Sequence, residues 1–305
     1  MRPAWSVILL TTLIGAGQGL FLALAGVDVF GEAPARFFVA GAAVALVLLA
    51  AGLAASFFHL GRPERAWRSA AMWRTSWLSR EVIVLPAFMA SVLAWGAAHH
   101  LGFSREAVVF LATVGSLLAA ALFLCTGMIY ACLKFLQEWH TPLTPLNYTA
   151  LGCASGLTAA AALAAWLHPP LAPAYAAAAL VSGALAYLAR LASLARNARL
   201  RPKSTLASAI GIKHPRITQI AQGAMGGSFN TREFFHGRPR EVLRAVRWSF
   251  LALVFPAPAA LLLFPQSLAL LAAAFAAQYA GLIAERWYFF AEANHPQNLY
   301  YQAIA

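Results

Sequence analysis

Long apolar runs decide what this chain can fold into. About 20 apolar residues let a helix cross the hydrocarbon core of a bilayer, whereas a membrane barrel shows alternating segments of about 10 residues. Because 61% of the residues are hydrophobic and only 10% are charged, a water-soluble globule is excluded. The sequence predicts a single membrane domain over 1–305, an all-α integral membrane protein with a bundle of eight transmembrane helices. The predicted spans are 5–26, 37–58, 81–100, 107–133, 147–167, 174–195, 248–265 and 268–290.

Prolines make two of these spans less distinct. Pro256, Pro258 and Pro265 interrupt or end the seventh run, and His168-Pro169-Pro170 separates the fifth run from the sixth. Proline breaks helix hydrogen bonding, so a count of seven stays open. The first run lacks a small-residue cleavage site, and we expect a retained helix there.

Positive charge is concentrated in two connections, 59–80 and 196–247. The first holds five and the second eleven of the 22 Lys and Arg residues. Both connections follow an even-numbered helix, so the positive-inside rule predicts a multi-pass protein of the cell inner membrane with these loops and both termini in the cytoplasm. The arginines are either topology signals that contact membrane lipids or a docking surface for an acidic protein. The docking candidates are Arg62, Arg65, Arg68 and Arg74, and no nucleic-acid partner is expected.

The histidines and cysteines do not form a cofactor site in the sequence. None of the eight histidines lies in the middle of a predicted span, where paired haem ligands would face each other. Cys125, Cys132 and Cys153 lie inside predicted helices without the close spacing of four thiolates that an iron–sulfur cluster needs. We therefore expect no haem, no metal and no cluster in this chain.

His59 and Glu81 mark the two ends of the first basic connection. His59 closes the second run and Glu81 opens the third, on the same side of the membrane. Consecutive helices usually pack with their axes ~8–10 Å apart, so the two side chains can converge on one ligand. Histidine titrates near neutral pH and a desolvated glutamate can be tuned toward it, which suits proton exchange with a quinone. The alternative is a solvent-facing histidine and a glutamate favoured by the helix dipole, with Ser79 as the N-cap.

A family resemblance covers most of the chain. His59-Leu60-Gly61-x-Pro63-x-Arg65-Ala66, followed by Leu78-Ser79-x-Glu81, resembles the membrane anchor subunit of dimethyl sulfoxide reductase. Gln18 in a Gly-rich first helix and Glu285-x-x-x-Phe289 in the last helix extend the likeness. The resemblance implies an anchor without haem that binds menaquinol or another quinone through His59 and Glu81. It also implies two partners, an iron–sulfur electron-transfer subunit and a molybdopterin catalytic subunit, which carry the other cofactors.

Other features look more like a related branch, the anchor of cytoplasmic sulfite-oxidising molybdoenzymes. Arg80 precedes the glutamate, and Glu285-Arg286-Trp287 ends the last helix. This likeness implies electron flow into the quinone pool, menaquinone or ubiquinone, during oxidation of sulfite. Oxidation of menaquinol by a dimethyl sulfoxide-type reductase is the alternative. Gln18, Arg80 and Arg286 are further quinone-binding candidates, although Gln18 can equally bond a neighbouring helix and Arg286 can pair with Glu285.

Two further interpretations stay open. Thr12-x-x-Gly15-x-x-x-Gly19 recurs as Thr149-x-x-Gly152-x-x-x-Gly156, which indicates either a duplication of four helices or close helix packing. The proline-broken seventh run is typical of secondary transporters, which use interrupted helices. We consider a transporter the less favoured alternative, because most acidic residues lie near helix ends.

Overall fold

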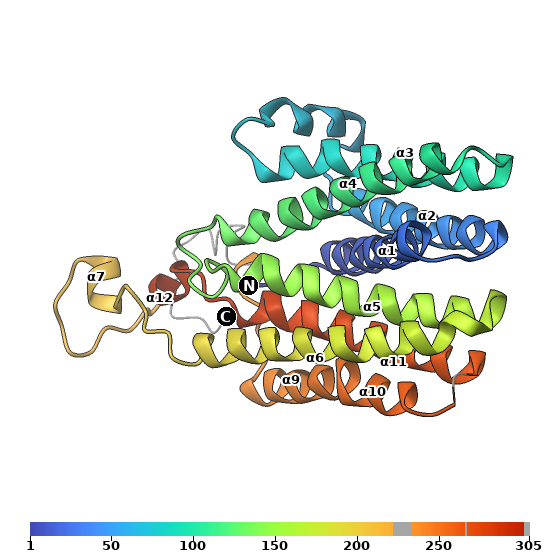
Figure 1. Cartoon of the computed structure of the whole chain (residues 1–305). Helices are drawn as coiled ribbons and strands as arrows, with labels where there is room; N and C mark the ends of the chain where they lie inside the picture. The colour runs from blue at the N-terminus through green and yellow to red at the C-terminus, as the bar shows by residue number, and fades with distance from the viewer. Residues whose placement is uncertain (222–232, 266, 302–305) are drawn as a thin grey trace.

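The computed structural model describes residues 1–221, 233–265 and 267–301, and Figure 1 draws the chain as a bundle of long helices. Residues 222–232 of the predicted basic connection 196–247 lie outside the described part. Eight helices of the described residues are long and apolar enough to cross a membrane, which confirms the predicted number of spans. They are α1 (Trp5–Phe30), α2 (Ala35–Phe57), α3 (Trp77–Leu101), α4 (Arg105–Ala131), α5 (Leu143–Leu167), α6 (Ala172–Asn197), α9 (Arg240–Val254) continued by α10 (Pro256–Leu262), and α11 (Leu268–Glu292).

The seventh span is interrupted where its prolines predict. α9 ends at Val254, and Phe255 separates it from α10, which starts at Pro256. Because proline has no backbone N–H, it is tolerated in the first turn of the second segment but not within a continuous helix. Shorter elements fill the connections: η1 (Pro63–Met72), η2 (Pro169–Leu171), α7 (Leu206–Ile210) and α12 (Gln297–Tyr301).

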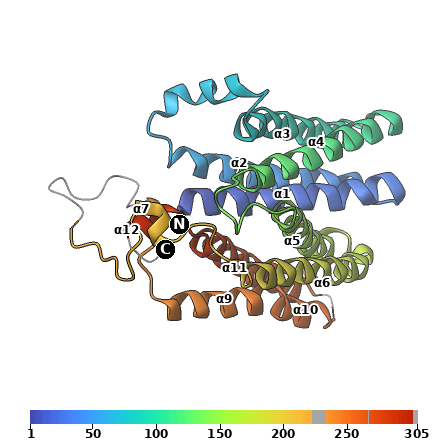
Figure 2. The ribbon, with the colours of Figure 1, turned by 90° about the vertical axis from the view of Figure 1, so that its left-hand side faces the viewer.

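α1 and α5 occupy the middle of the bundle. α3 and α4 lie on one side of this pair, and α6, α9, α10 and α11 lie on the other (Figure 2). The N-terminus, α7 and α12 lie together at one end (Figure 1). We call this the basic end; it also carries the connections 58–76 and 132–142. The opposite end is called the far end.

The repeated glycine motif brings α1 and α5 into backbone contact. A Cβ atom added at Gly19 would fall on the Gly152 carbonyl oxygen, and one added at Gly156 would fall on the Gly19 backbone. Gly15 lies opposite Gly152 in the same crossing. Small residues allow helices in lipid to approach this closely, so the close-packing interpretation of the motif is confirmed. A duplication stays a hypothesis.

Candidate functional site

Glu81 is buried within the membrane domain. α3 begins at Trp77, four residues earlier than predicted, because the Ser76 side chain caps the helix by accepting a hydrogen bond from the Ser79 N–H at 3.3 Å. Ser79 is therefore not the N-cap, and Glu81 does not open the helix. Four residues correspond to a rise of about 6 Å, which places Glu81 in the second turn. Only 7% of its surface is exposed.

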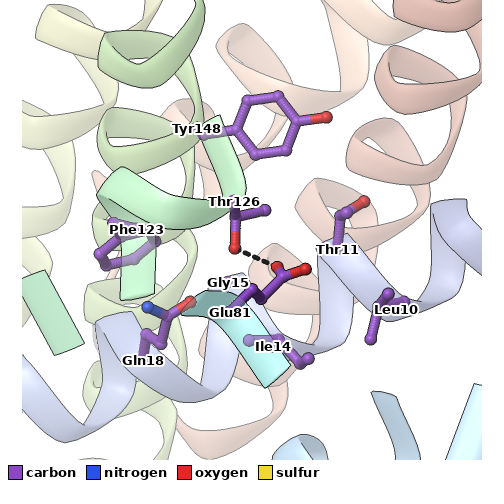
Figure 3. Close-up of a pocket in the computed structure, with 9 residues that line it drawn as sticks. All are labelled: Leu10, Thr11, Ile14, Gly15, Gln18, Glu81, Phe123, Thr126 and Tyr148. Carbon is purple, nitrogen blue, oxygen red and sulfur yellow. Dashed lines mark hydrogen bonds between the residues drawn. The ribbon is translucent and has the colours of Figure 1, made fainter. Parts of the chain in front are cut away.

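A small pocket surrounds the Glu81 carboxylate (Figure 3). Its lining comes from α1, α3, α4 and α5. The cavity volume is about 10 Å³, which is room for about one water molecule. A larger ligand therefore requires the lining groups to move apart. The pocket residues are Leu10, Thr11, Ile14, Gly15, Gln18, Glu81, Phe123, Thr126 and Tyr148.

Few polar groups offset the cost of burying the Glu81 carboxylate. The Thr126 hydroxyl donates a hydrogen bond of 2.5 Å to Glu81 Oε1. Gln18 uses its Nε2 to donate to the Ala119 carbonyl at 3.0 Å, while its amide oxygen lies on the side of Glu81 (Figure 3). Within the described residues, no cation lies within ion-pair distance of Glu81. An ionisable group so sparsely paired at membrane depth indicates a functional site.

A second pocket of about 20 Å³ adjoins the first and brings in Arg286. The two pockets share Thr11, Gly15 and Tyr148. The Arg286 guanidinium lies 3.7 Å from the centroid of the Tyr148 ring, an arrangement that favours a cation–π interaction. Its Nε pairs with Glu285 Oε2 at 2.8 Å. Arg286 therefore pairs with Glu285, as one sequence alternative predicts, and its place in the quinone site stays a prediction.

The Arg286 pair continues into a buried network of charges. Glu285 Oε1 lies 2.8 Å from Nε of Arg190, and Arg190 Nη2 lies 3.9 Å from Glu292 Oε2. Arg190 and Glu285 are each only 1% exposed. Sequence reasoning missed Arg190, although an arginine inside the apolar run 174–195 is itself a signal of a buried polar partner.

Comparison with known proteins covers the whole chain. The family model of the DMSO reductase anchor subunit (DmsC) matches residues 1–291. The chain belongs to the DmsC family. It is also 53% identical over 327 aligned positions to the C subunit of sulfite dehydrogenase from Allochromatium vinosum, and the alignment includes 100% of both chains.

Two predicted residues of this DmsC-family anchor lie outside the pocket lining. His59 is exposed on the connection after α2, at the same end of the bundle as Glu81, and partial burial lowers the pKa of its imidazole below 6.5. Arg80 turns toward the connection, where it donates to the Trp73 and Arg74 carbonyls at 2.9 and 2.8 Å. The structure brings Glu81 and Gln18 into one pocket and Arg286 into the adjoining one.

The predicted docking arginines of the DmsC-family chain are exposed along η1 and its flanks. Arg62, Arg65, Arg68 and Arg74 are exposed, and no residue of η1 is buried. The guanidinium of Arg68 lies 5.4 Å from the Trp67 ring, and Arg74 lies 5.4 Å from the Trp73 ring. Trp67 is 71% exposed, so η1 and its flanks expose both cations and aromatic rings.

A different charged cluster closes the far end. The Asp28 carboxylate accepts hydrogen bonds from Trp95 Nε1 and Arg105 Nη1, each at 2.7 Å, and lies 3.1 Å from His99 Nε2. A second Arg105 nitrogen donates to the Asp28 carbonyl. The predicted first span ended at residue 26, but α1 extends to Phe30 and places Asp28 inside the bundle. Nothing in the spacing of these residues predicts that they meet.

Proposed function

We propose that this chain is the quinone-binding membrane anchor of a molybdopterin and iron–sulfur oxidoreductase. It exchanges electrons between the quinone pool of the cell inner membrane and an iron–sulfur subunit, and it needs no haem of its own. The observation that carries the proposal is the buried Glu81 carboxylate, which has one hydrogen bond and no counter-ion among the described residues, in a pocket between four helices. Membership of the DmsC family supports the role of an anchor.

The pocket chemistry fits a quinone headgroup. Leu10, Ile14 and Phe123 supply apolar walls for a ring, and the polar groups of Gln18, Glu81 and Thr126 converge from three helices. A bound quinone accepts two electrons and two protons and becomes a quinol. Glu81 supplies the group that donates or accepts a proton at a ring oxygen. Because the pocket is closed around about one water, ring binding requires Thr126 or its helix to shift away from Glu81.

In this proposal, His59 and Arg80 lie at the entrance to the quinone site. Both lie at the basic end, His59 on the connection that leads from α2 into α3 and Arg80 in the first turn of α3. His59 has its pKa lowered by partial burial, so at neutral pH its imidazole is mostly neutral and able to accept a proton. Arg80 stacks on the Trp77 ring, 4.3 Å from its centroid, and holds the start of α3.

The substrate proposal rests on the similarity to a sulfite dehydrogenase component. We infer that the catalytic partner oxidises sulfite and that electrons flow toward quinone. The exposed arginines of η1 then face an iron–sulfur partner in the cytoplasm, with both termini on that side. A DMSO-type reductase oxidising menaquinol is the second candidate, favoured by the family description, and would reverse the flow.

The test compares Glu81→Gln with wild type in the intact complex purified from membranes. We expect reduction of a short-chain ubiquinone or menaquinone by sulfite to fall at least about a hundredfold, the usual contribution of a positioned acid–base group. Reduction of a water-soluble dye by the partner subunits should stay unchanged. Glu106→Gln, at an exposed position of the far end, is the matched control. Unchanged quinone reduction in Glu81→Gln would exclude this site, and turnover only with dimethyl sulfoxide and quinol would select the second candidate.

A further inference from the structure

A larger cavity at the basic end is separate from the Glu81 pocket. Its volume is about 560 Å³, and Glu138, Asn197 and His295 contribute polar groups to its lining. Glu292, the last residue of α11, neighbours this cavity: Asn197 lies within hydrogen-bonding reach of it, and Glu138 is near enough for their charges to interact. The Glu292 side chain is 16% exposed. Asn197 and Glu138, which line the cavity, therefore connect it to one end of the buried charge network.

The network runs from this cavity toward Glu81 through a chain of close contacts. Arg190 lies between Glu292 and Glu285, at 3.9 and 2.8 Å. Glu285 in turn pairs with Arg286 at 2.8 Å, and Arg286 lies over Tyr148. The Tyr148 ring lines both small pockets, one of which contains Glu81 and the other Arg286. Among the described residues, the only gaps between the network and Glu81 are thus these two small pockets, each of which has room for about one water molecule.

The composition of the network argues against a purely structural role. Two arginines balance two carboxylates, so the group is neutral overall when each residue has its usual charge. Burying ion pairs costs desolvation energy, and well-packed apolar residues often stabilise a protein as well or better. Ionisable groups inside membrane domains commonly mark proton or ion pathways. The Arg286 Nη1 atom has no hydrogen-bond partner within the described residues, which leaves a donor for water in the adjoining pocket.

We propose that Glu292, Arg190, Glu285 and Arg286 form the route by which protons from the larger cavity reach the quinone beside Glu81. This inference rests on the proposed function. Reduction of one quinone takes two electrons from the iron–sulfur partner and two protons from water at the basic end, and forms two O–H bonds. Glu292 and Glu285 accept and release each proton in turn on its way from the larger cavity, while the arginines stay charged and hold the carboxylates in place. Glu81 donates one proton to a ring oxygen and is reprotonated through water in the two small pockets, and the second O–H bond takes a proton delivered by the same route.

The test uses Glu292→Gln in the intact complex, because removal of Glu285 would leave buried Arg286 without its ion-pair partner and Arg190 with only the 3.9 Å contact to Glu292. We expect sulfite-to-quinone turnover to fall at least about tenfold, with the KM for a short-chain quinone and the amount of bound quinone unchanged. The solvent isotope effect should rise, and a small weak acid such as azide should restore part of the rate. Glu106→Gln is the control that should match wild type. Glu138→Gln, at the cavity lining, is a second variant if Glu292→Gln fails to assemble.

Each outcome decides between separate hypotheses. Wild-type turnover and isotope effect in Glu292→Gln and Glu138→Gln would overturn the proton route while Glu81→Gln still reports on the quinone site. A rate loss that azide does not relieve and that is accompanied by loss of bound quinone would assign the network a structural role and overturn the route. Absence of quinone from the wild-type complex, with no effect of Glu81→Gln, would instead defeat the proposed function.

Discussion

Each end of the bundle holds a buried carboxylate, and the two carboxylates differ in how many partners they have. At the far end, Asp28 is 1% exposed and has three side-chain partners, including the guanidinium of Arg105. At the basic end, Glu81 is 7% exposed and has one neutral partner within the described residues, the Thr126 hydroxyl. A buried charge is costly unless it is paired, so the full set of partners around Asp28 is what a structural tie between α1, α3 and α4 requires. The sparse surroundings of Glu81 leave it available for a ligand.

The largest expected loss of unfolding free energy follows from removing Asp28 at the far end. Asp28→Ala leaves the buried Trp95 N–H and His99 without their charged acceptor, whereas the half-exposed Arg105 can bind water instead. A hydrogen bond to a charged group contributes about 1.5–3 kcal/mol, so the loss of two predicts a fall of about 3–5 kcal/mol in unfolding free energy. Denaturant titration of the complex in mixed micelles measures the loss. Glu32→Ala, at an exposed far-end position, is the control. A loss below about 1 kcal/mol, the level of an exposed ion pair, would show that Asp28 is not a structural tie.

The second largest loss of unfolding free energy is expected from removing the only hydrogen bond that Glu81 has within the described residues. Thr126→Val keeps the side-chain shape but removes the donor, and a hydrogen bond to a charged group contributes about 1.5–3 kcal/mol. We expect a loss of that size in the wild-type background and a smaller one in a Glu81→Gln background. A double-mutant cycle on unfolding free energy measures the coupling. Equal losses in both backgrounds would mean that the two side chains do not interact.

How well the sequence predicts this molecule differs between its parts. The eight spans follow from runs of apolar residues, because each helix satisfies its own backbone hydrogen bonds in lipid and needs no knowledge of its neighbours. The break near Pro256 follows from the missing N–H of proline. The glycine crossing of α1 and α5 also has a visible signal, a repeated pattern of small residues.

The sites were less predictable, because they depend on which helix faces meet. Glu81 is recognisable as a charge beside an apolar run, but Thr126 is one of many hydroxyls in apolar helices, and most of these bond their own backbone. His59 and Glu81 are neighbours in the predicted topology, yet Glu81 faces α1, α4 and α5 while His59 is exposed. A shift of four residues in the start of α3 was enough to move Glu81 from the helix end into the bundle.

A smaller effect is expected for the stability of Glu81→Gln. The amide keeps the shape and can still accept a hydrogen bond from Thr126, but it carries no charge to desolvate. Unfolding free energy should stay within about 1 kcal/mol of wild type or rise, in contrast to Asp28→Ala. The same titration in mixed micelles measures it. A loss as large as that of Asp28→Ala would mean that both carboxylates are structural, and the comparison between the ends would no longer hold.

The smallest effect at neutral pH concerns His236 at the basic end, whose contribution to stability changes only in acid. Burial, the nearby N-terminal amine and Arg238 lower the pKa of its imidazole from 6.5 to about 4. Between these two values the unfolded chain binds a proton that the folded chain does not, so stability is complete above pH 6.5 and falls as the pH drops toward about 4. His236→Asn keeps a side-chain acceptor for the Arg238 N–H, which His236 Nδ1 accepts at 3.0 Å. We expect the variant to lose less unfolding free energy than wild type as the pH is lowered through this range. Denaturant titration at each pH measures this loss. If unfolding free energy falls equally with pH in both proteins, His236 is protonated as readily in the folded protein as in the unfolded chain.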